Sequence, residues 1–207
     1  MLHTVDHPLI IEELTRLRDP NCPSAEFRQR VRRIASLMVP AVTADMASTV
    51  VPCTTPLEIT SGSKLTRGII LVPVLRAGLG FLDGFLDLIP QASVAHIGLA
   101  RNEKTLVPEP YYLKHPPVLG EHEIVILDPM LATGGSGIEA VRALCEAGAR
   151  HVRFVCLVAA PEGITALQSA FPDLSIYVAC VDRCLNERGY ILPGLGDAGD
   201  RLFGTCR

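Results

Sequence analysis

Short runs of apolar residues alternate along the chain with stretches of helical spacing. The runs are rich in Val, Ile and Leu and are too short for helices, which predicts strands near residues 68–75, 94–99, 124–127, 152–159 and 176–181. Between them, apolar side chains recur every three or four residues, which predicts helices near 79–89, 138–147 and 164–170. Strands that are apolar throughout and separated by helices are typical of a parallel sheet with helices on both faces. The pattern therefore predicts an α/β fold.

The ends of these strands locate the expected binding site. In open parallel sheets, ligands bind beyond the carboxyl ends of the strands. Functional residues are therefore expected just after Leu75, Leu99, Leu127, Ala159 and Val181.

The first part of the chain has a different, helical pattern. Phe27, Val31, Ile34 and Met38 follow one another at spacings of four, three and four, which places them on one face of a helix. Residues 1–65 are therefore predicted to form an N-terminal helical segment.

The whole chain, residues 1–207, is expected to form a single domain. Residues 66–185 hold the predicted strands of the sheet core, and residues 186–207 form a C-terminal segment. Within the core, residues 101–117 are polar and rich in proline, with strand-like residues at either end. Because long polar excursions in compact domains are usually lids or subunit arms, this stretch is predicted to be a β-hairpin arm.

Composition narrows the classes of protein. The 207 residues are 48% hydrophobic and 20% charged, with a net charge of −3, as in ordinary globular proteins. No apolar run reaches the length of a membrane span, and no secretory signal is apparent, so a cytoplasmic protein is expected. The seven cysteines contain no CxxC pair and are expected to be reduced. The arginines of residues 28–33 favour a solvated or subunit-facing surface over a nucleic-acid contact.

The sequence LDPMLATGGSG, residues 127–137, predicts a phosphate-binding loop. A strand ends at Asp128, and Thr133 to Ser136 opens a helix whose first backbone amides would face an anion. The Asp128 carboxylate suits ribose hydroxyls, since it accepts two hydrogen bonds at once. The structural alternative is a glycine-rich turn with a buried capping aspartate.

Two arginines at strand ends predict a second anion site. Arg76 follows one strand and Arg101 ends the next, and guanidinium groups bind phosphates in a bidentate manner. Each arginine alone would more often form a surface salt bridge. The glycine-rich C-terminal stretch, residues 189–205, lacks helical or strand periodicity and is interpreted as a ligand-reading segment that uses its backbone.

Together, VPVLRAGLG, HIGLARNEKTL, LDPMLATGGS, VCLVAAPEG and LNERGYILPGLGDAGDRLFGT resemble the uracil phosphoribosyltransferases through nearly the whole chain. The resemblance implies a type I phosphoribosyltransferase-like parallel sheet flanked by helices. A small hood from the N- and C-terminal segments and a hairpin arm at 101–117 would complete it. The implied reaction converts uracil and 5-phospho-α-D-ribose 1-diphosphate (PRPP) into UMP and diphosphate in pyrimidine salvage. An oxocarbenium-like displacement needs no protein nucleophile.

The resemblance also implies residue roles. Asp197, Asp128 and Arg76 would be catalytic. Uracil would be bound at Ile191, Gly196, Asp197 and Ala198. PRPP would be bound by Arg76, Arg101, Asp128, Pro129, Met130, Leu131, Ala132, Thr133, Gly134, Gly135, Ser136 and Asp197. Mg²⁺ would be held mainly by PRPP and water, with Asp197 as the protein carboxylate.

Several alternatives stay open at this point. Some family members respond to GTP, so GTP is a candidate effector, and a homodimer or higher homo-oligomer is expected. Departures from the family pattern at residues 38–41, 50–64 and 180–184 affect subunit contacts and effector binding more than the reaction. The alternative functions are a nucleotide-sensing regulatory protein that retains the PRPP site and a phosphoribosyltransferase for another base.

Overall fold

The chain folds around one large, mostly parallel sheet. The computed structural model describes residues 1–101 and 108–205, without the side chain of Arg101. The sheet has the order β1-β11-β10-β8-β4-β6-β7, in which β7 alone runs antiparallel, and short strands β5 and β9 pair with β4 and β10. The strands span Leu2–Thr4 (β1), Ile69–Leu75 (β4), Ser93–Val94 (β5), His96–Arg101 (β6), Pro108–Lys114 (β7), Glu123–Leu127 (β8), Met130–Leu131 (β9), His151–Ala159 (β10) and Ser175–Val181 (β11).

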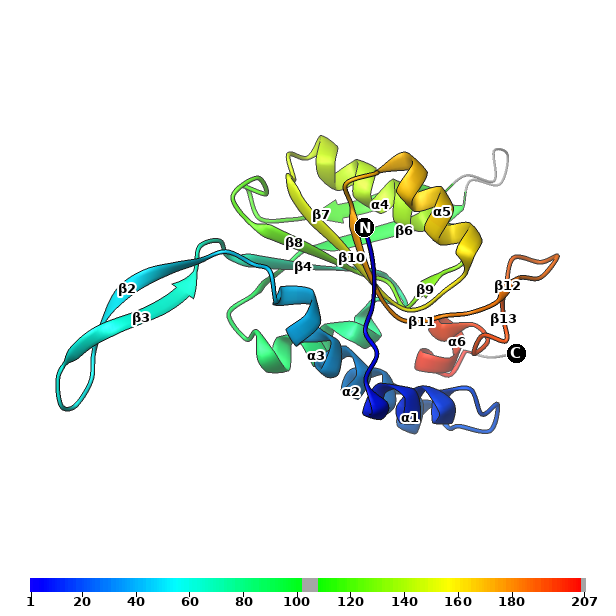
Figure 1. Cartoon of the computed structure of the whole chain (residues 1–207). Coiled ribbons are helices and arrows are strands. Elements are labelled where there is room, and N and C mark those ends of the chain that lie inside the picture. The colour runs from blue at the N-terminus through cyan, green and yellow to red at the C-terminus, as the bar shows by residue number, and fades with distance from the viewer. Residues whose placement is uncertain (102–107, 206–207) are drawn as a thin grey trace.

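Helices cover both faces of the sheet, as Figure 1 shows. On one face lie α1 (Pro8–Leu17), α2 (Ser24–Thr43) and α3 (Leu79–Leu88); on the other lie α4 (Gly135–Glu146) and α5 (Pro161–Ala170). Along β4, Ile69 and Leu71 belong to the core on one face, and Ile70 and Val72 to the core on the other. Because both faces are buried, the strands contain few polar residues, and the predicted α/β fold is confirmed.

The N-terminal prediction is wrong beyond α2. Residues 48–65 form an antiparallel hairpin of β2 (Ser48–Thr54) and β3 (Ile59–Leu65), which projects far from the body of the molecule (Figure 1). At its tip, Thr55 accepts backbone hydrogen bonds from Leu57 and Glu58. Threonine and valine favour extended backbone, and this local turn closes the hairpin without support from the core.

The projecting arm is therefore not the one predicted at residues 101–117. In that region β6 and β7 do pair as an antiparallel hairpin, but they form the edge of the main sheet. Residues 102–107 lie outside the described residues. We refer to β2–β3 as the arm from here on.

The C-terminal segment contains more regular structure than its sequence predicted. Two short strands, β12 (Cys184–Leu185) and β13 (Ile191–Leu192), pair as a hairpin, and α6 (Ala198–Phe203) follows. The helix begins at Asp197, whose carboxylate accepts a hydrogen bond from the Asp200 amide at 2.9 Å. No helix within residues 1–101 and 108–205 is long and apolar enough to cross a bilayer. The cysteines in the same residues are free thiols.

Candidate active site

A cavity of about 440 Å³ opens at the carboxyl ends of β4 and β8. The strand ends contribute Arg76 and Asp128, and the loop of residues 128–136, which we call the phosphate loop, contributes Met130, Ala132 and Ser136. The opposite wall is the hood segment, residues 186–205, with Ile191, Gly196, Asp197 and Ala198. Residues predicted separately for ribose phosphate and for base thus line one cavity.

The other predicted PRPP residues have different surroundings. Thr133 and Gly135 line a wider neighbouring cavity of about 730 Å³, which shares Ala132 and Ser136 with the first. Pro129, Leu131 and Gly134 are buried residues of the loop itself and line neither cavity. The side chain of Arg101 lies outside the described residues, although its backbone ends β6 at the same edge of the sheet.

The phosphate loop presents open backbone amides. Gly134, with a φ of +87°, precedes α4 without any side-chain cap, so the first amides of the helix are free to bind an anion. The loop rests on α5, where Gly163 leaves no room for a side chain: a Cβ there would lie 2.3 Å from the Ala132 carbonyl oxygen. Glycine at this position therefore allows the phosphate loop to pack closely against α5.

Asp128 is the buried acid of the site. Its side chain accepts a hydrogen bond from the Met130 amide at 3.3 Å and is only 8% exposed. Burial raises the pKa of Asp128 to about 7, and the Met130 hydrogen bond opposes that rise. Near neutral pH, the protonated and the ionised forms of this carboxyl group are therefore both populated.

Arg76 is positioned by the turn that ends β4. The peptide bond between Leu75 and Arg76 is cis, and Gly78 packs so closely that a Cβ would lie 2.2 Å from the Leu127 carbonyl oxygen. The guanidinium is 3.4 Å from Asp200 and 5.8 Å from the centre of the Phe203 ring. More than half of its side chain is exposed, so this ion pair is weak and leaves the cation available to a ligand.

The hood is shaped by backbone conformation. Gly194 and Gly196 have φ values of +61° and +81°, which side chains other than glycine rarely adopt, and the Leu192–Pro193 bond is cis. These turns bring Gly196, Asp197 and Ala198 to the cavity wall. That backbone groups of this wall read the ligand stays a prediction.

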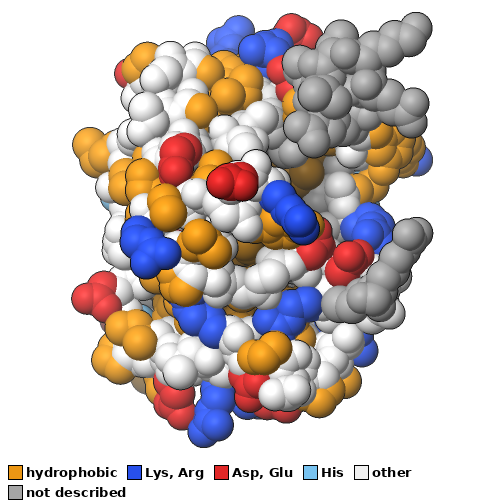
Figure 2. Space-filling model, turned by 90° about the vertical axis from the view of Figure 1, so that its right-hand side faces the viewer, with side chains coloured by type: hydrophobic (Ala, Val, Ile, Leu, Met, Phe, Trp, Pro, Cys, Tyr) orange, Lys and Arg blue, Asp and Glu red, His pale blue; other side chains and the backbone are white. Residues whose placement is uncertain are grey.

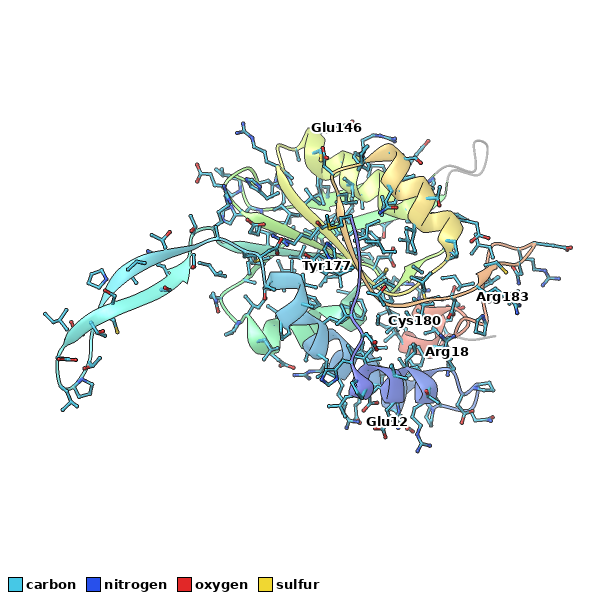
Figure 3. All side chains as sticks on the ribbon, in the orientation of Figure 1. Glu12, Arg18, Glu146, Tyr177, Cys180 and Arg183 are labelled. Atoms are coloured by element: carbon cyan, nitrogen blue, oxygen red, sulfur yellow. The ribbon has the colours of Figure 1, made fainter. Side chains whose placement is uncertain are left out.

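A brace from the N-terminal helices holds the hood. Arg18 pairs with Asp182 through both terminal nitrogens and also donates to the Gly194 carbonyl. Burial raises the pKa of Asp182, but the hydrogen bonds from Arg18 and from the Gly194 amide outweigh it, so the pKa falls below its usual value. Figure 3 shows Arg18 and Cys180 together where α1 meets the end of β11.

Arg201 forms the second half of the brace. Its guanidinium donates to the carbonyl oxygens of Leu17, Asp19 and Leu195 and lies 4.4 Å from the centre of the Phe27 ring. Neither Arg18 nor Arg201 was found by sequence reasoning, because most of their partners are far away in the chain. Asp182 could have been found, since it directly follows the fifth predicted strand.

The arginines of residues 28–33 are committed within the chain. Arg30 and Arg33 pair with Glu13, Arg32 pairs with Asp87, and Arg28 donates to the Leu202 carbonyl. On the face in Figure 2, basic and acidic side chains are interspersed without a continuous basic surface. Each of these four arginines therefore has a hydrogen-bonding partner within the chain.

The carboxylates near the cavity do not form a metal cage. Among the side chains that the structure describes, no group of three or more His, Cys, Asp or Glu residues is close enough to hold a metal ion. Asp128 and Asp197 contribute single carboxylates to the cavity wall. Such a donor set fits a hard cation that keeps most of its ligands from substrate oxygens and water.

The sequence matches the family described as uracil phosphoribosyltransferase over residues 4–205. Similar proteins include uracil phosphoribosyltransferases of Ligilactobacillus salivarius and Clostridium tetani, which are 54% and 52% identical over 202 residues, with 97% of this chain and 97% of each relative covered. A solved structure of a protein from Aquifex aeolicus superposes with a TM-score of 0.92 at 37% identity and covers 98% of both chains.

A more distant structure shares only the fold. A hypoxanthine-guanine phosphoribosyltransferase of Bacillus anthracis is 12% identical, with a TM-score of 0.53 over 77% of this chain and 80% of that one. The full-length match, by contrast, includes both the phosphate loop and the hood that line the cavity. The chain belongs to the uracil phosphoribosyltransferase family.

Proposed function

We propose that the protein transfers the phosphoribosyl group of PRPP to uracil, giving UMP and diphosphate in pyrimidine salvage. The observation that carries the proposal is the meeting, in one cavity, of the phosphate loop with the hood wall at Gly196 to Ala198. The first suits a ribose 5-phosphate, and the second suits the hydrogen-bonding edge of a planar pyrimidine. Family membership supports both assignments.

Different residues of the cavity bind different groups of PRPP. The amides at the start of α4 bind the 5′-phosphate, with Thr133 and Ser136 as hydroxyl donors. Asp128, once ionised, accepts the ribose hydroxyls. Arg76 binds the diphosphate and stabilises the charge that develops on it as it leaves.

Uracil lies against Ile191 and the Gly196–Ala198 backbone, where Asp197 faces the reacting carbon. When bound, Mg²⁺ would neutralise charge on the diphosphate, and Asp197 would be the protein carboxylate that helps to hold it. The anomeric carbon becomes oxocarbenium-like as its bond to the diphosphate breaks. The chain therefore contributes positioning, electrostatic stabilisation and exclusion of water.

We further propose that the protein works as a homo-oligomer in the cytoplasm. The arm exposes large apolar side chains, with Val50, Leu57 and Ile59 at 71%, 95% and 75% exposure, and such surfaces usually mark interaction sites. Free thiols at the described cysteines are usual in a reducing compartment. GTP remains a candidate effector, to be tested by adding it to the assay below.

The decisive experiment measures UMP formation from uracil and PRPP with and without Mg²⁺. We expect product only with Mg²⁺, and none from cytosine or hypoxanthine. If cytosine or hypoxanthine instead gave its nucleoside monophosphate, the enzyme would have a different base specificity. If no product forms while PRPP still binds in calorimetry, the alternative of a regulatory protein with a retained PRPP site is favoured.

A further inference from the structure

The β12–β13 hairpin places a tight turn against the phosphate loop. The Asn186 side-chain oxygen accepts hydrogen bonds from the amides of Arg188 and Tyr190, both at 2.9 Å, and the Gly189 amide donates to the Asn186 carbonyl. A Cβ on Gly189 would lie 3.7 Å from the Thr133 methyl group, so the turn reaches that loop. The turn is thus a built structure that faces the site of the 5′-phosphate.

The base of the hairpin is anchored to the helix beneath it. The Leu185 amide donates to the Glu162 carboxylate at 3.0 Å, and this bond lowers the pKa of Glu162. Glu162 stands in the first turn of α5, the same helix on which the phosphate loop rests. The hairpin and the phosphate loop therefore both contact α5, which fixes their positions relative to each other.

This turn presents Arg188 to both cavities. Arg188 lines the cavity that holds Asp128 and Ser136, and also the wider cavity that holds Thr133 and Gly135. Arg76 lines only the first. Arg188 therefore lies toward the 5′-phosphate end of the site, whereas Arg76 lies toward the diphosphate end.

The Arg188 guanidinium has no carboxylate partner among the described residues. Within residues 1–101 and 108–205, no carboxylate forms an ion pair with it. Two acids, Glu139 and Glu187, also line the wider cavity; Arg142 pairs with Glu139, and Glu187 forms no pair with Arg188. By contrast, Arg18, Arg76 and Arg201 all have partners within the chain. An unpaired cation beside open helix amides is the arrangement expected of an anion site.

We propose that Arg188 is a further binding residue for the 5′-phosphate. Its guanidinium would bind the phosphate from the hood, and the amides at the start of α4 would bind it from the phosphate loop. The inference rests on the proposed function and adds one residue to its 5′-phosphate site. The 5′-phosphate is common to PRPP and UMP, whereas diphosphate lacks it. Loss of Arg188 therefore weakens UMP and PRPP binding and leaves diphosphate binding unchanged.

The test compares three alanine variants by calorimetry, with UMP and with magnesium diphosphate as separate ligands. We expect Arg188→Ala to weaken UMP binding about 10–100-fold, the size of one charged hydrogen-bonding contact, without changing diphosphate binding. Arg76→Ala should show the reverse. The matched control is Arg183→Ala, because Arg183 is exposed on the same hairpin, lines neither cavity and is labelled in Figure 3. The control should bind both ligands as the wild type does.

Further variants separate charge from folding. Arg188→Lys keeps the positive charge and should recover part of the affinity for UMP, whereas Arg188→Glu should lose more than alanine does. The alanine, lysine and glutamate variants at Arg188 should all keep the wild-type melting temperature, as expected for an exposed side chain, and this result would exclude unfolding as the cause of weaker binding. Wild-type UMP affinity in Arg188→Ala would overturn the inference, as would equal losses for UMP and diphosphate.

The same measurements separate this inference from the proposed function. If the wild type makes UMP and Arg188→Ala binds UMP normally, the inference fails and the function stands. If the wild type makes no UMP but Arg188→Ala selectively loses UMP binding, the 5′-phosphate contact stands and the catalytic assignment fails.

Discussion

Arg18 and Asp182 bind each other through two hydrogen bonds, at 2.8 and 2.7 Å, across 164 residues of chain. The same carboxylate accepts the Gly194 amide at 2.8 Å, and Arg18 donates to the Gly194 carbonyl at 2.8 Å. Both hydrogen-bonding groups of the Gly194 backbone are therefore fixed by this pair. Gly194 is two residues before the stretch proposed to bind uracil, so the pair determines where that stretch lies.

Removing the charge of Asp182 should therefore impair uracil binding more than PRPP binding. Asp182→Asn keeps the volume but loses one acceptor for Arg18, in a group that is only 4% exposed. We expect the KM for uracil to rise about tenfold and the KM for PRPP to change less than threefold, since a lost charged hydrogen bond costs about 1.5–3 kcal/mol. Steady-state kinetics with each substrate varied in turn would measure this.

The exposed residue Asp173 offers a matched control. Asp173→Asn makes the same chemical change at the surface and should leave both KM values unchanged. Equal increases in the two KM values for Asp182→Asn would contradict a role in positioning the uracil wall and would indicate a general loss of structure.

Asp128 should make PRPP binding depend on pH near neutrality. The pKa of Asp128 is about 7, and the ionised form accepts ribose hydroxyls. PRPP affinity should therefore rise between pH 6 and pH 8 and then level off. Asp128→Asn should bind PRPP more weakly and lose this pH dependence. Calorimetry at constant ionic strength would show both effects, and an identical pH profile in the variant would remove Asp128 from the ribose site.

The same group should affect stability in the opposite direction. A carboxyl group with a raised pKa binds more protons in the folded state, so its contribution to stability is lost as pH rises from about 4 through about 7. Asp128→Asn should thus unfold with a higher free energy than the wild type at pH 8, by up to about 4 kcal/mol, and with a smaller gain at pH 5. Urea unfolding at both pH values would test the sign.

The contribution of Asp197 to turnover should be separable from its contribution to stability. Asp197→Asn removes the charge that faces the ribose and Mg²⁺, and we expect turnover to fall about 10²–10³-fold. Asparagine caps helices as well as aspartate does, so α6 should keep its N-terminal hydrogen bond to the Asp200 amide. The melting temperature should change little, whereas Asp197→Ala should lose both activity and about 1 kcal/mol of stability. Turnover near that of the wild type in Asp197→Asn would place the residue outside the reaction.

Gly163 should be intolerant of a single methyl group. A Cβ at this position would lie 2.3 Å from the Ala132 carbonyl oxygen and 2.8 Å from that of Leu131, so the phosphate loop would have to move. We expect Gly163→Ala to destabilise the fold by about 1–3 kcal/mol and to raise the KM for PRPP. Thr165→Ala, at an exposed position of the same helix, should have neither effect. Thermal unfolding and kinetics with varied PRPP would check both expectations.

The sheet and the phosphate loop were predictable because their signals are local. Each buried strand is a short apolar run, and the loop combines a strand end with the glycines that open α4. The arm was missed because residues 48–65 bury almost nothing: without a buried face, a strand shows no clear alternation of apolar and polar residues.

The brace and Arg188 were missed for a different reason. Arg18 and Arg201 look like ordinary surface cations in the sequence, and only the fold brings them to carbonyl groups more than 160 residues away. Arg188 differs from them because no described carboxylate pairs with it, which no sequence pattern can show. Tertiary contacts, not composition, distinguish these arginines from one another.

The brace also has a consequence for the newly made chain. It joins Arg18 and its neighbours near the start of the chain to residues 182–201, with contacts that span up to 184 positions. A ribosome synthesises the N-terminal helices first and must then produce nearly the whole protein before Asp182, Gly194 and Arg201 emerge. The sheet has all its strands by Val181, yet the hood has nothing to hold it until synthesis is almost complete. Nascent chains that stop short of the hood would thus be compact without being able to select a base.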